Sequence, residues 1–160
     1  MKKKVLESKV KVRFHDCDPF NHLNNSRYID YIITARADQL IDNYQLDIYD
    51  YTRKNGLGWV TAQTQISYLS PAYLMEELII ETQLIAFTPK SLSLEAYVWN
   101  TNKTEIKAVM WTKLVHFNLK TKQAQVHPDE LQSLFASVVN PLSEPVDFES
   151  RVKNLKIMKS

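Results

Sequence analysis

Glycine is almost absent from this sequence. Gly56 and Gly58 are the only two glycines in 160 residues. Loops that cradle phosphate groups, of the Walker or dinucleotide-binding type, need several positions without a Cβ so that the backbone can approach the phosphates closely. The sequence therefore excludes nucleotide binding through loops of this kind.

Cysteine and long apolar runs are equally scarce. Cys17 is the single cysteine, so the chain has no internal disulfide. No stretch approaches the roughly 18 apolar residues of a membrane-spanning helix, and the basic start MKKK is not followed by the apolar segment of a secretory signal. These absences predict a cytoplasmic protein without a membrane partner.

Charge of one sign is not in excess either. Twenty Lys and Arg residues are balanced by eighteen Asp and Glu residues, and the basic residues are spread along the chain. This pattern lacks the basic patch of a nucleic-acid-binding surface. With 44% hydrophobic and 24% charged residues, the composition favours one globular domain with a substantial core.

A regular alternation of apolar and polar residues is present in five segments of the chain. This period is typical of half-buried β-strands. The segments cover residues 10–14, 60–68, 78–86, 92–98 and 106–116. Short turn sequences separate the last four segments, which predicts that neighbouring strands are antiparallel.

A segment with helical spacing lies between the first and the second of these strands. Residues 25–44 contain neither glycine nor proline, their apolar residues recur at helical spacing, and Asn24 or Asn25 is placed as the N-cap. The early part, YIDYII, is apolar on nearly every side, which predicts that it is covered all round. We therefore predict an α+β domain in which a curved antiparallel sheet folds around one long central helix.

The C-terminal part of the chain is divided by its prolines. HPDELQSLF, with Pro128 at a helix-start position, predicts a short helix. We place the domain at residues 1–140. Residues 141–160 contain Pro141, Pro145 and scattered charges, and we expect them to form a loosely attached tail.

The residues able to carry chemistry concentrate in RFHDCDPFNHLNNSRYIDYI, residues 13–32. Several have metal-binding atoms, but residues 15–18 are consecutive and point alternately to opposite faces of an extended chain, which is not zinc spacing. An EF-hand loop starting at Asp16 fails as well, because its sixth residue is Asn21 instead of glycine and its twelfth is Arg27 instead of glutamate. No metal site is predicted.

Nucleophilic cysteine chemistry is also disfavoured. Cys17 lies between two acids, which raise the pKa of its thiol. The histidines outside the motif centre, His15, His116 and His127, are isolated in the sequence and are interpreted as structural or solvent-facing.

Asp18 has a different position relative to the predicted helix. It lies too far before Asn24 and Asn25 to cap the helix itself. A carboxylate beside a helix start can attack a carbonyl carbon, or activate water toward it, while the free N–H groups of the helix bind the carbonyl oxygen. This arrangement suits acyl transfer.

The stretch DCDPFNHLNNSRYIDYI resembles the signature of the hotdog-fold acyl-CoA thioesterases of the 4-hydroxybenzoyl-CoA thioesterase type, in which Asp-x-Asp, His-x-Asn-Asn and Tyr-x-x-Tyr recur in this order. The resemblance covers about residues 5–135 and implies a hotdog fold. It also implies hydrolysis of an acyl thioester of coenzyme A, or of acyl carrier protein, to free acid and thiol. No cofactor is implied, because coenzyme A enters only as part of the substrate.

The resemblance also assigns residues. Asp18 matches the catalytic carboxylate, acting as base or nucleophile, His22 matches a histidine near the thioester, and Asn25 stands where a backbone N–H polarises the thioester carbonyl. Lys90 and Ser91 resemble residues that bind near the coenzyme A nucleotide. Because relatives of this type place the site between two subunits, the resemblance implies a homodimer, or a homotetramer, in which Lys90 and Ser91 serve the partner's Asp18.

Two positions depart from the family pattern. Asn21 stands where a glycine usually precedes the histidine, and Ile33 stands where many members have a glutamate. The alternative that these departures favour is a non-catalytic hotdog module that binds acyl-CoA or acts as an assembly unit. A dehydratase or isomerase of the same fold is disfavoured, because the Asp-x-Asp spacing belongs to the hydrolases. The acyl chain, the carrier, the pathway and the choice between dimer and tetramer stay open.

Overall fold

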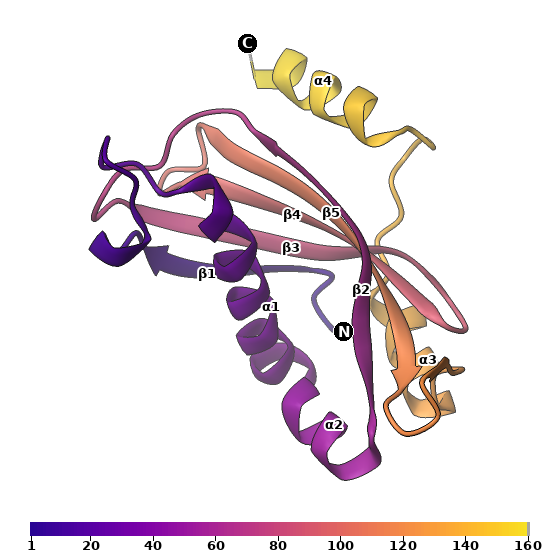
Figure 1. Ribbon diagram of the computed structural model, residues 1–160. Coiled ribbons are helices and arrows are strands. Elements are labelled where there is room, and N and C mark those ends of the chain that lie inside the picture. The colour runs from indigo at the N-terminus through magenta and orange to yellow at the C-terminus, as the bar shows by residue number, and fades with distance from the viewer. Residues whose placement is uncertain (160) are drawn as a thin grey trace.

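A curved antiparallel sheet wraps around one long helix (Figure 1). The computed structural model describes residues 1–159, in which five long strands follow the order β1-β3-β4-β5-β2 across the sheet. They are β1 (Val5–Lys11), β2 (Leu57–Tyr68), β3 (Glu77–Thr88), β4 (Ser91–Asn100) and β5 (Ile106–Asn118). A two-residue strand, β6 (Gln123–Ala124), pairs with the end of β5. The predicted α+β class and the hotdog arrangement of sheet and helix are confirmed.

Helix α1 (Tyr28–Tyr44) lies on the concave face of the sheet. A 3-10 turn, η2 (Asn25–Arg27), precedes it, so helical structure begins where the sequence predicts. Asn24 is the N-cap, and its side-chain oxygen accepts the N–H of Ser26 at 2.9 Å. The main core cluster consists of α1 residues and inward-facing strand residues, among them Tyr28, Ile32, Ile80, Val98 and Ala108.

Helix α2 (Ile48–Asn55) and the 3-10 turn η1 (Phe14–Asp16) were not predicted. The first strand ends at Lys11, so the expectation that it continues to residue 14 is wrong. α2 has eight residues, of which only Ile48, Tyr49 and Tyr51 are apolar or aromatic, so it gives little helical signal in the sequence. The two capping residues were the signal that could have predicted α2 from the sequence. The Asp47 carboxylate accepts two N–H groups of the first turn, and Gly56 ends the helix with φ of 65°.

The predicted short helix near Pro128 is confirmed as α3 (Asp129–Val138). It closes one end of the molecule, where Leu131, Phe135 and Val138 pack with Leu84 and Leu92 of the sheet. Among residues 1–159, no helix combines the length and the apolar character needed to span a bilayer.

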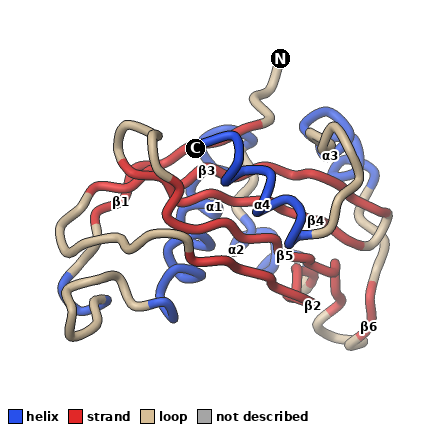
Figure 2. The backbone as a smooth tube through the Cα atoms, turned by 90° about the horizontal axis from the view of Figure 1, so that it is seen from above, coloured by secondary structure: helices blue, strands red, loops and turns tan. Residues whose placement is uncertain are grey.

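The C-terminal segment differs from the loosely attached tail that we expected. Helix α4 (Phe148–Lys159) lies on the convex face of the sheet, opposite α1 (Figure 2). The alternation of side chains along a strand serves both layers: Ile80 faces α1, whereas its neighbour Ile79 packs in a cluster with Val152 of α4. The tail therefore covers apolar sheet surface that would otherwise be exposed.

A buried ion pair fixes α4 to the sheet. The Glu95 side chain is 0% exposed, and it accepts the Nε of Arg151 at 2.9 Å and the Nη2 at 3.0 Å. Burial alone raises the pKa of Glu95, but hydrogen bonds from Arg151, Tyr97 and Trp111 outweigh it, so the pKa lies below its ordinary value. The prolines and scattered charges of this segment suggested a loose tail. That expectation was wrong because the sequence does not reveal that Arg151 pairs with the buried Glu95.

Two histidines form a pair at the end of the sheet near α2 and α3. The rings of His116 and His127, both buried, lie 4.8 Å apart between centroids. The Tyr51 hydroxyl lies 2.9 Å from Nε2 of His116, and Trp59 donates its Nε1–H to Nε2 of His127 at 3.1 Å. The structural interpretation of these two histidines is confirmed, although no pattern in the sequence indicated that they meet.

Removal of the Arg151 guanidinium should destabilise the fold strongly. The Arg151→Met variant leaves the Glu95 carboxylate buried without its counter-charge, so the free energy of unfolding should fall by about 3–5 kcal/mol in chemical denaturation. Lys153→Met, on an exposed position of the same helix, is the matched control and should change it by less than about 0.5 kcal/mol. Equal stabilities of the two variants would contradict the role of Arg151.

Stability should also fall in mild acid because of His127. Burial, with the neighbouring His116 as second cause, lowers the pKa of His127 from 6.5 to about 4. Between these values the unfolded chain binds a proton that the folded chain does not, so the free energy of unfolding decreases as the pH drops, by up to about 3 kcal/mol.

The His127→Gln variant keeps an acceptor for Trp59 and removes the titrating group. Its thermal midpoint should depend less on pH between 6.5 and 4 than that of the unchanged protein. The exposed His15, replaced by glutamine, serves as the control substitution. A pH dependence as steep in His127→Gln as in the unchanged protein would show that another group is responsible.

Candidate active site

The motif residues form a tight hairpin between η1 and the start of the helix. Its cross-strand links are the backbone hydrogen bond from Asn24 to Asp16, the bridge between Cys17 and Leu23, and the hydrogen bond from Asp18 to His22. The hairpin sets Asp18 and His22 opposite each other, and Asn25 directly follows the last linked residue. Local backbone pairing therefore brings the three predicted catalytic positions to one corner of the molecule.

The turn of this hairpin requires a left-handed residue. Asn21 has φ of 61°, and its N–H donates to the carbonyl of Asp18 at 3.0 Å. Asparagine adopts this conformation more readily than other residues with a Cβ. Asparagine at this position is therefore compatible with the turn, which a glycine would also allow.

The Asp18 carboxylate lies against the inside of this turn. Its Oδ1 accepts the N–H groups of Phe20 at 2.9 Å and of His22 at 3.1 Å. Asp18 is half-buried, and within residues 1–159 its Oδ2 has no hydrogen-bond partner. One oxygen thus fixes the orientation of the carboxylate while the other is available.

The other acid of the motif links the hairpin to α1. Asp16 is buried, and its Oδ2 accepts the hydroxyl of Tyr31 at 2.6 Å. Burial first, and then the hydrogen bond to Asp16, raises the pKa of Tyr31 to about 12. Because Tyr31 belongs to the first turn of α1, this bond holds the hairpin in register with the helix.

His22 and Asn25 are placed by two tyrosines. The His22 ring meets the Tyr73 ring edge-on, with centroids 5.0 Å apart. Tyr68 donates its hydroxyl to the Asn25 carbonyl at 3.0 Å. The N–H of Asn25 opens the helical segment, and it has no partner among the described residues. It is a free donor at an exposed position.

The cysteine of the motif, Cys17, is not an activated nucleophile. Cys17 is half-buried, and burial, followed by the charges of Asp18 and Asp16, raises the pKa of its thiol. The sequence argument against a thiolate nucleophile is confirmed in direction. Within residues 1–159, no group of three or more His, Cys, Asp or Glu side chains is arranged to hold a metal ion.

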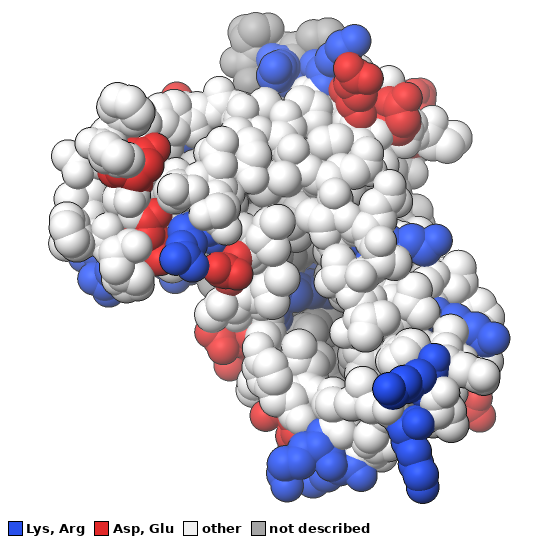
Figure 3. Space-filling view, viewed as in Figure 1, with Lys and Arg blue, Asp and Glu red and all other residues white. Residues whose placement is uncertain are grey.

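A mostly apolar cavity of about 190 Å³ lies between α1 and the sheet. Figure 3 shows this side of the molecule hollowed near its middle. Helix α1 contributes Ile32, Ile33 and Arg36 to the lining, and the sheet contributes Trp59 and Leu84 among others. Such walls suit a hydrocarbon chain. This lining was not predictable from sequence, because its residues come from four strands and three helices.

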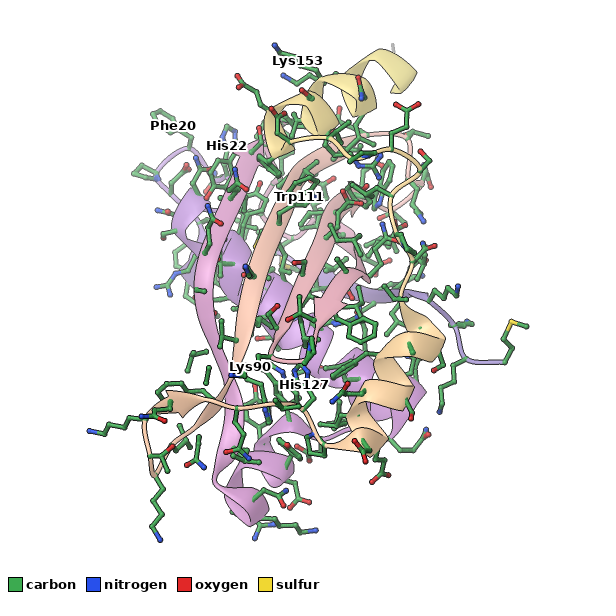
Figure 4. All side chains as sticks on the ribbon, turned by 90° about the vertical axis from the view of Figure 1, so that its right-hand side faces the viewer. Phe20, His22, Lys90, Trp111, His127 and Lys153 are labelled. Atoms are coloured by element: carbon green, nitrogen blue, oxygen red, sulfur yellow. The ribbon has the colours of Figure 1, made fainter. Side chains whose placement is uncertain are left out.

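Lys90 lies far from this corner within one chain. In Figure 4 it lies beside His127 at one end of the sheet, whereas Phe20 and His22 lie at the other end. Lys90 is exposed in the turn between β3 and β4, and the buried histidines hold this turn. The N–H of His116 donates to the carbonyl of Lys90 at 2.8 Å, and the N–H of His127 donates to that of Pro89 at 2.7 Å.

Ser91, the other predicted substrate-binding residue, is buried at the start of β4. Its hydroxyl lies 2.7 Å from that of Thr88, across the turn. If the Thr88 hydroxyl is the donor, the Ser91 hydroxyl can still donate a hydrogen bond to a nucleotide. Its position stabilises the turn that presents Lys90.

Known proteins with similar sequences are thioesterases. The sequence model of the thioesterase-like superfamily matches residues 12–135. The long-chain acyl-CoA thioesterase FadM of Escherichia coli (strain K12) is 27% identical over 134 residues, which cover 84% of this chain and 99% of FadM.

Solved structures agree in fold. YbaW, a probable thioesterase from Escherichia coli, is 27% identical with a TM-score of 0.71, and the match covers 84% of this chain and 99% of YbaW. The protein SAV2348 from Staphylococcus aureus, solved in complex with CoA, has a TM-score of 0.78 at 14% identity over 91% of this chain and 92% of its own. Since the superfamily model spans most of the sequence and the hotdog architecture agrees, this chain belongs to the thioesterase-like superfamily.

Proposed function

We propose that the protein hydrolyses acyl-CoA thioesters to a free acid and coenzyme A, with Asp18 as the catalytic carboxylate. The proposal rests on the geometry of the hairpin. One oxygen of Asp18 is fixed by two backbone amides, and the other has no hydrogen-bond partner among the described residues and lies close to the helix start at Asn25. The similarity to FadM, a long-chain acyl-CoA thioesterase, supports the substrate class.

The chemistry follows from these positions. The Asn25 N–H binds the carbonyl oxygen and stabilises the negative charge that develops on it. The Asp18 carboxylate either takes a proton from the attacking water or attacks the carbonyl carbon itself, forming an anhydride that water then hydrolyses. In both routes the carbon–sulfur bond breaks, the thiolate leaves and takes up a proton, and water supplies the oxygen of the acid. His22, held against Tyr73, orients the thioester.

The active unit in this proposal is a homodimer, with a homotetramer as the alternative. Lys90 lies at the opposite end of the sheet from His22 in one chain, so in this proposal Lys90 and its neighbour Ser91 contact coenzyme A bound at Asp18 of the partner subunit. Two features support such an assembly. β2 is an edge strand of the sheet, and Ile33 and Ile41 of α1 are 46% and 40% exposed.

A non-catalytic module is the second candidate, motivated by the departures at Asn21 and Ile33. Asn21 keeps the left-handed turn that the family glycine provides, so this departure does not disturb the placement of Asp18. The Ile33 side chain lines the apolar cavity, away from the hairpin. The geometry therefore favours the enzyme.

Asp18→Asn tests the catalytic assignment. The amide oxygen can still accept the two hairpin N–H groups, but the side chain can no longer act as base or nucleophile, so kcat should fall by about 10²–10⁴-fold with little change in KM. Thiol release from short-, medium- and long-chain acyl-CoAs measures this effect. Asp30→Asn, at an exposed carboxylate early on α1, is the control and should keep full activity. Turnover that survives in Asp18→Asn would refute the assignment.

Lys90→Ala tests the nucleotide contact and the choice of carrier. Loss of an ammonium that meets a phosphate should raise KM for an acyl-CoA by about tenfold. The same acyl group on pantetheine, which lacks the nucleotide, should show no change. Lys120→Ala, an exposed lysine in the β5–β6 turn, is the control. An equal effect on both thioesters would rule out the nucleotide contact, and faster hydrolysis of acyl carrier protein esters would favour that carrier.

A further inference from the structure

Arg36 occupies an unusual place for a charged residue. It lies midway along α1 and, of the described residues that line the cavity, it alone carries a charge. Its Nη1 donates to the Thr82 hydroxyl at 2.8 Å, and its Nε is buried without a hydrogen-bond partner within residues 1–159. The Thr82 hydroxyl donates in turn to Gln39, so a neutral network fixes the guanidinium in the cavity wall.

No carboxylate balances this charge. Among the ion pairs within the described residues, none includes Arg36. Burial lowers the pKa of Arg36 to about 10, which leaves the group charged at neutral pH. Arg151 shows the contrast, since it meets a buried carboxylate through two hydrogen bonds. Arg36 is half-buried, and its buried Nε lies in an apolar wall without a counter-charge, so a negative ligand would stabilise it.

The neighbouring residue Ile33 also leaves Arg36 without a carboxylate partner. Ile33 lies three residues before Arg36 on the helix and lines the same cavity. A glutamate there, as in many members of the family, would be within reach of an ion pair with Arg36. In this chain that position is apolar, so no carboxylate three residues before Arg36 on α1 balances its charge.

We propose that Arg36 binds a carboxylate at the far end of the acyl group, so that the preferred substrates are thioesters of dicarboxylic acids. This rests on the proposed thioesterase function. A planar guanidinium pairs with a carboxylate through two parallel hydrogen bonds, and the apolar cavity walls accommodate the methylene groups between the two ends. Arg36 then distinguishes this acyl group from a plain hydrocarbon chain, which would cover the guanidinium without satisfying its donors.

The helix sets the length of such a substrate. Arg36 follows Asn25 by eleven positions, which is about 16 Å along the axis at roughly 1.5 Å per residue. Because helical side chains lean toward the N-terminus, the guanidinium lies several ångströms closer to the thioester than its Cα. An acyl chain of medium length spans this gap, whereas a short dicarboxylic chain does not reach Arg36.

The test compares acyl-CoAs of equal length that end in a methyl, a hydroxyl or a carboxylate group. At medium length the unchanged protein should hydrolyse the carboxylate-ended ester with a kcat/KM at least tenfold above the methyl-ended one. Arg36→Met, which is unbranched and apolar, should reverse this preference, and Arg36→Lys should weaken it. Arg53→Met, at an exposed arginine of α2, should leave it unchanged.

A binding experiment separates this proposal from the hydrolase proposal. Calorimetry of the unchanged protein with a medium-chain fatty carboxylate, and with the alcohol of the same length, needs no turnover. The carboxylate should bind at least tenfold more tightly, and Arg36→Met should abolish the difference. This result would stand even if Asp18→Asn retained activity.

Three outcomes would overturn the proposal. The first is an unchanged protein that shows no preference for the carboxylate-ended ester at any length. The second is an equal preference for hydroxyl-ended and carboxylate-ended esters, which would indicate a neutral acceptor. The third is an Arg36→Met variant that loses thermal stability while its substrate ratio stays the same, which would make Arg36 a structural residue.

Discussion

Helix α1 begins with residues that are apolar on nearly every side, and they leave water only if other elements surround them. The curved sheet covers one side of this segment, because strands β3, β4 and β5 turn one face of their alternating side chains toward Tyr28, Ile32 and Ala35. The expectation that the segment is covered all round is wrong for one chain, since Ile33 is 46% exposed. The opposite face of the same strands then needs its own cover, and α4 supplies it. The two-layered core thus follows from the burial of one helix.

The same constraint explains where the candidate site lies. The sheet covers the body of α1, but the chain enters the helix through the hairpin, so the first N–H groups stay at the surface. The bond between Asp16 and Tyr31 fixes the hairpin to α1, and the turn at Asn21 sets the direction of Asp18. Reactive groups therefore collect at the helix start because its N–H groups are unpaired and exposed there.

Much of this was readable in the sequence. Alternation predicted the long strands, helical spacing and Asn24 predicted the central helix, and the quoted motif placed Asp18, His22 and Asn25 together. The tertiary contacts that were not predicted share one cause. The pairing of His116 with His127 and the pairing of Arg151 with Glu95 join residues that are distant in sequence, and no local pattern encodes such contacts. The short helix α2 was missed because it has only eight residues and few of them are apolar.

The sequence by itself determined the elements, their order and the local geometry of the motif, because period, capping and turn preference act over a few residues. Only the tertiary structure decided that the tail covers the sheet, that Lys90 lies at the far end from Asp18, and that Arg36 faces an apolar cavity without a counter-charge. These facts depend on which distant side chains share a buried space. Which side chains are buried and which charges are paired depends on contacts between residues that are distant in sequence, so only the folded chain determines them.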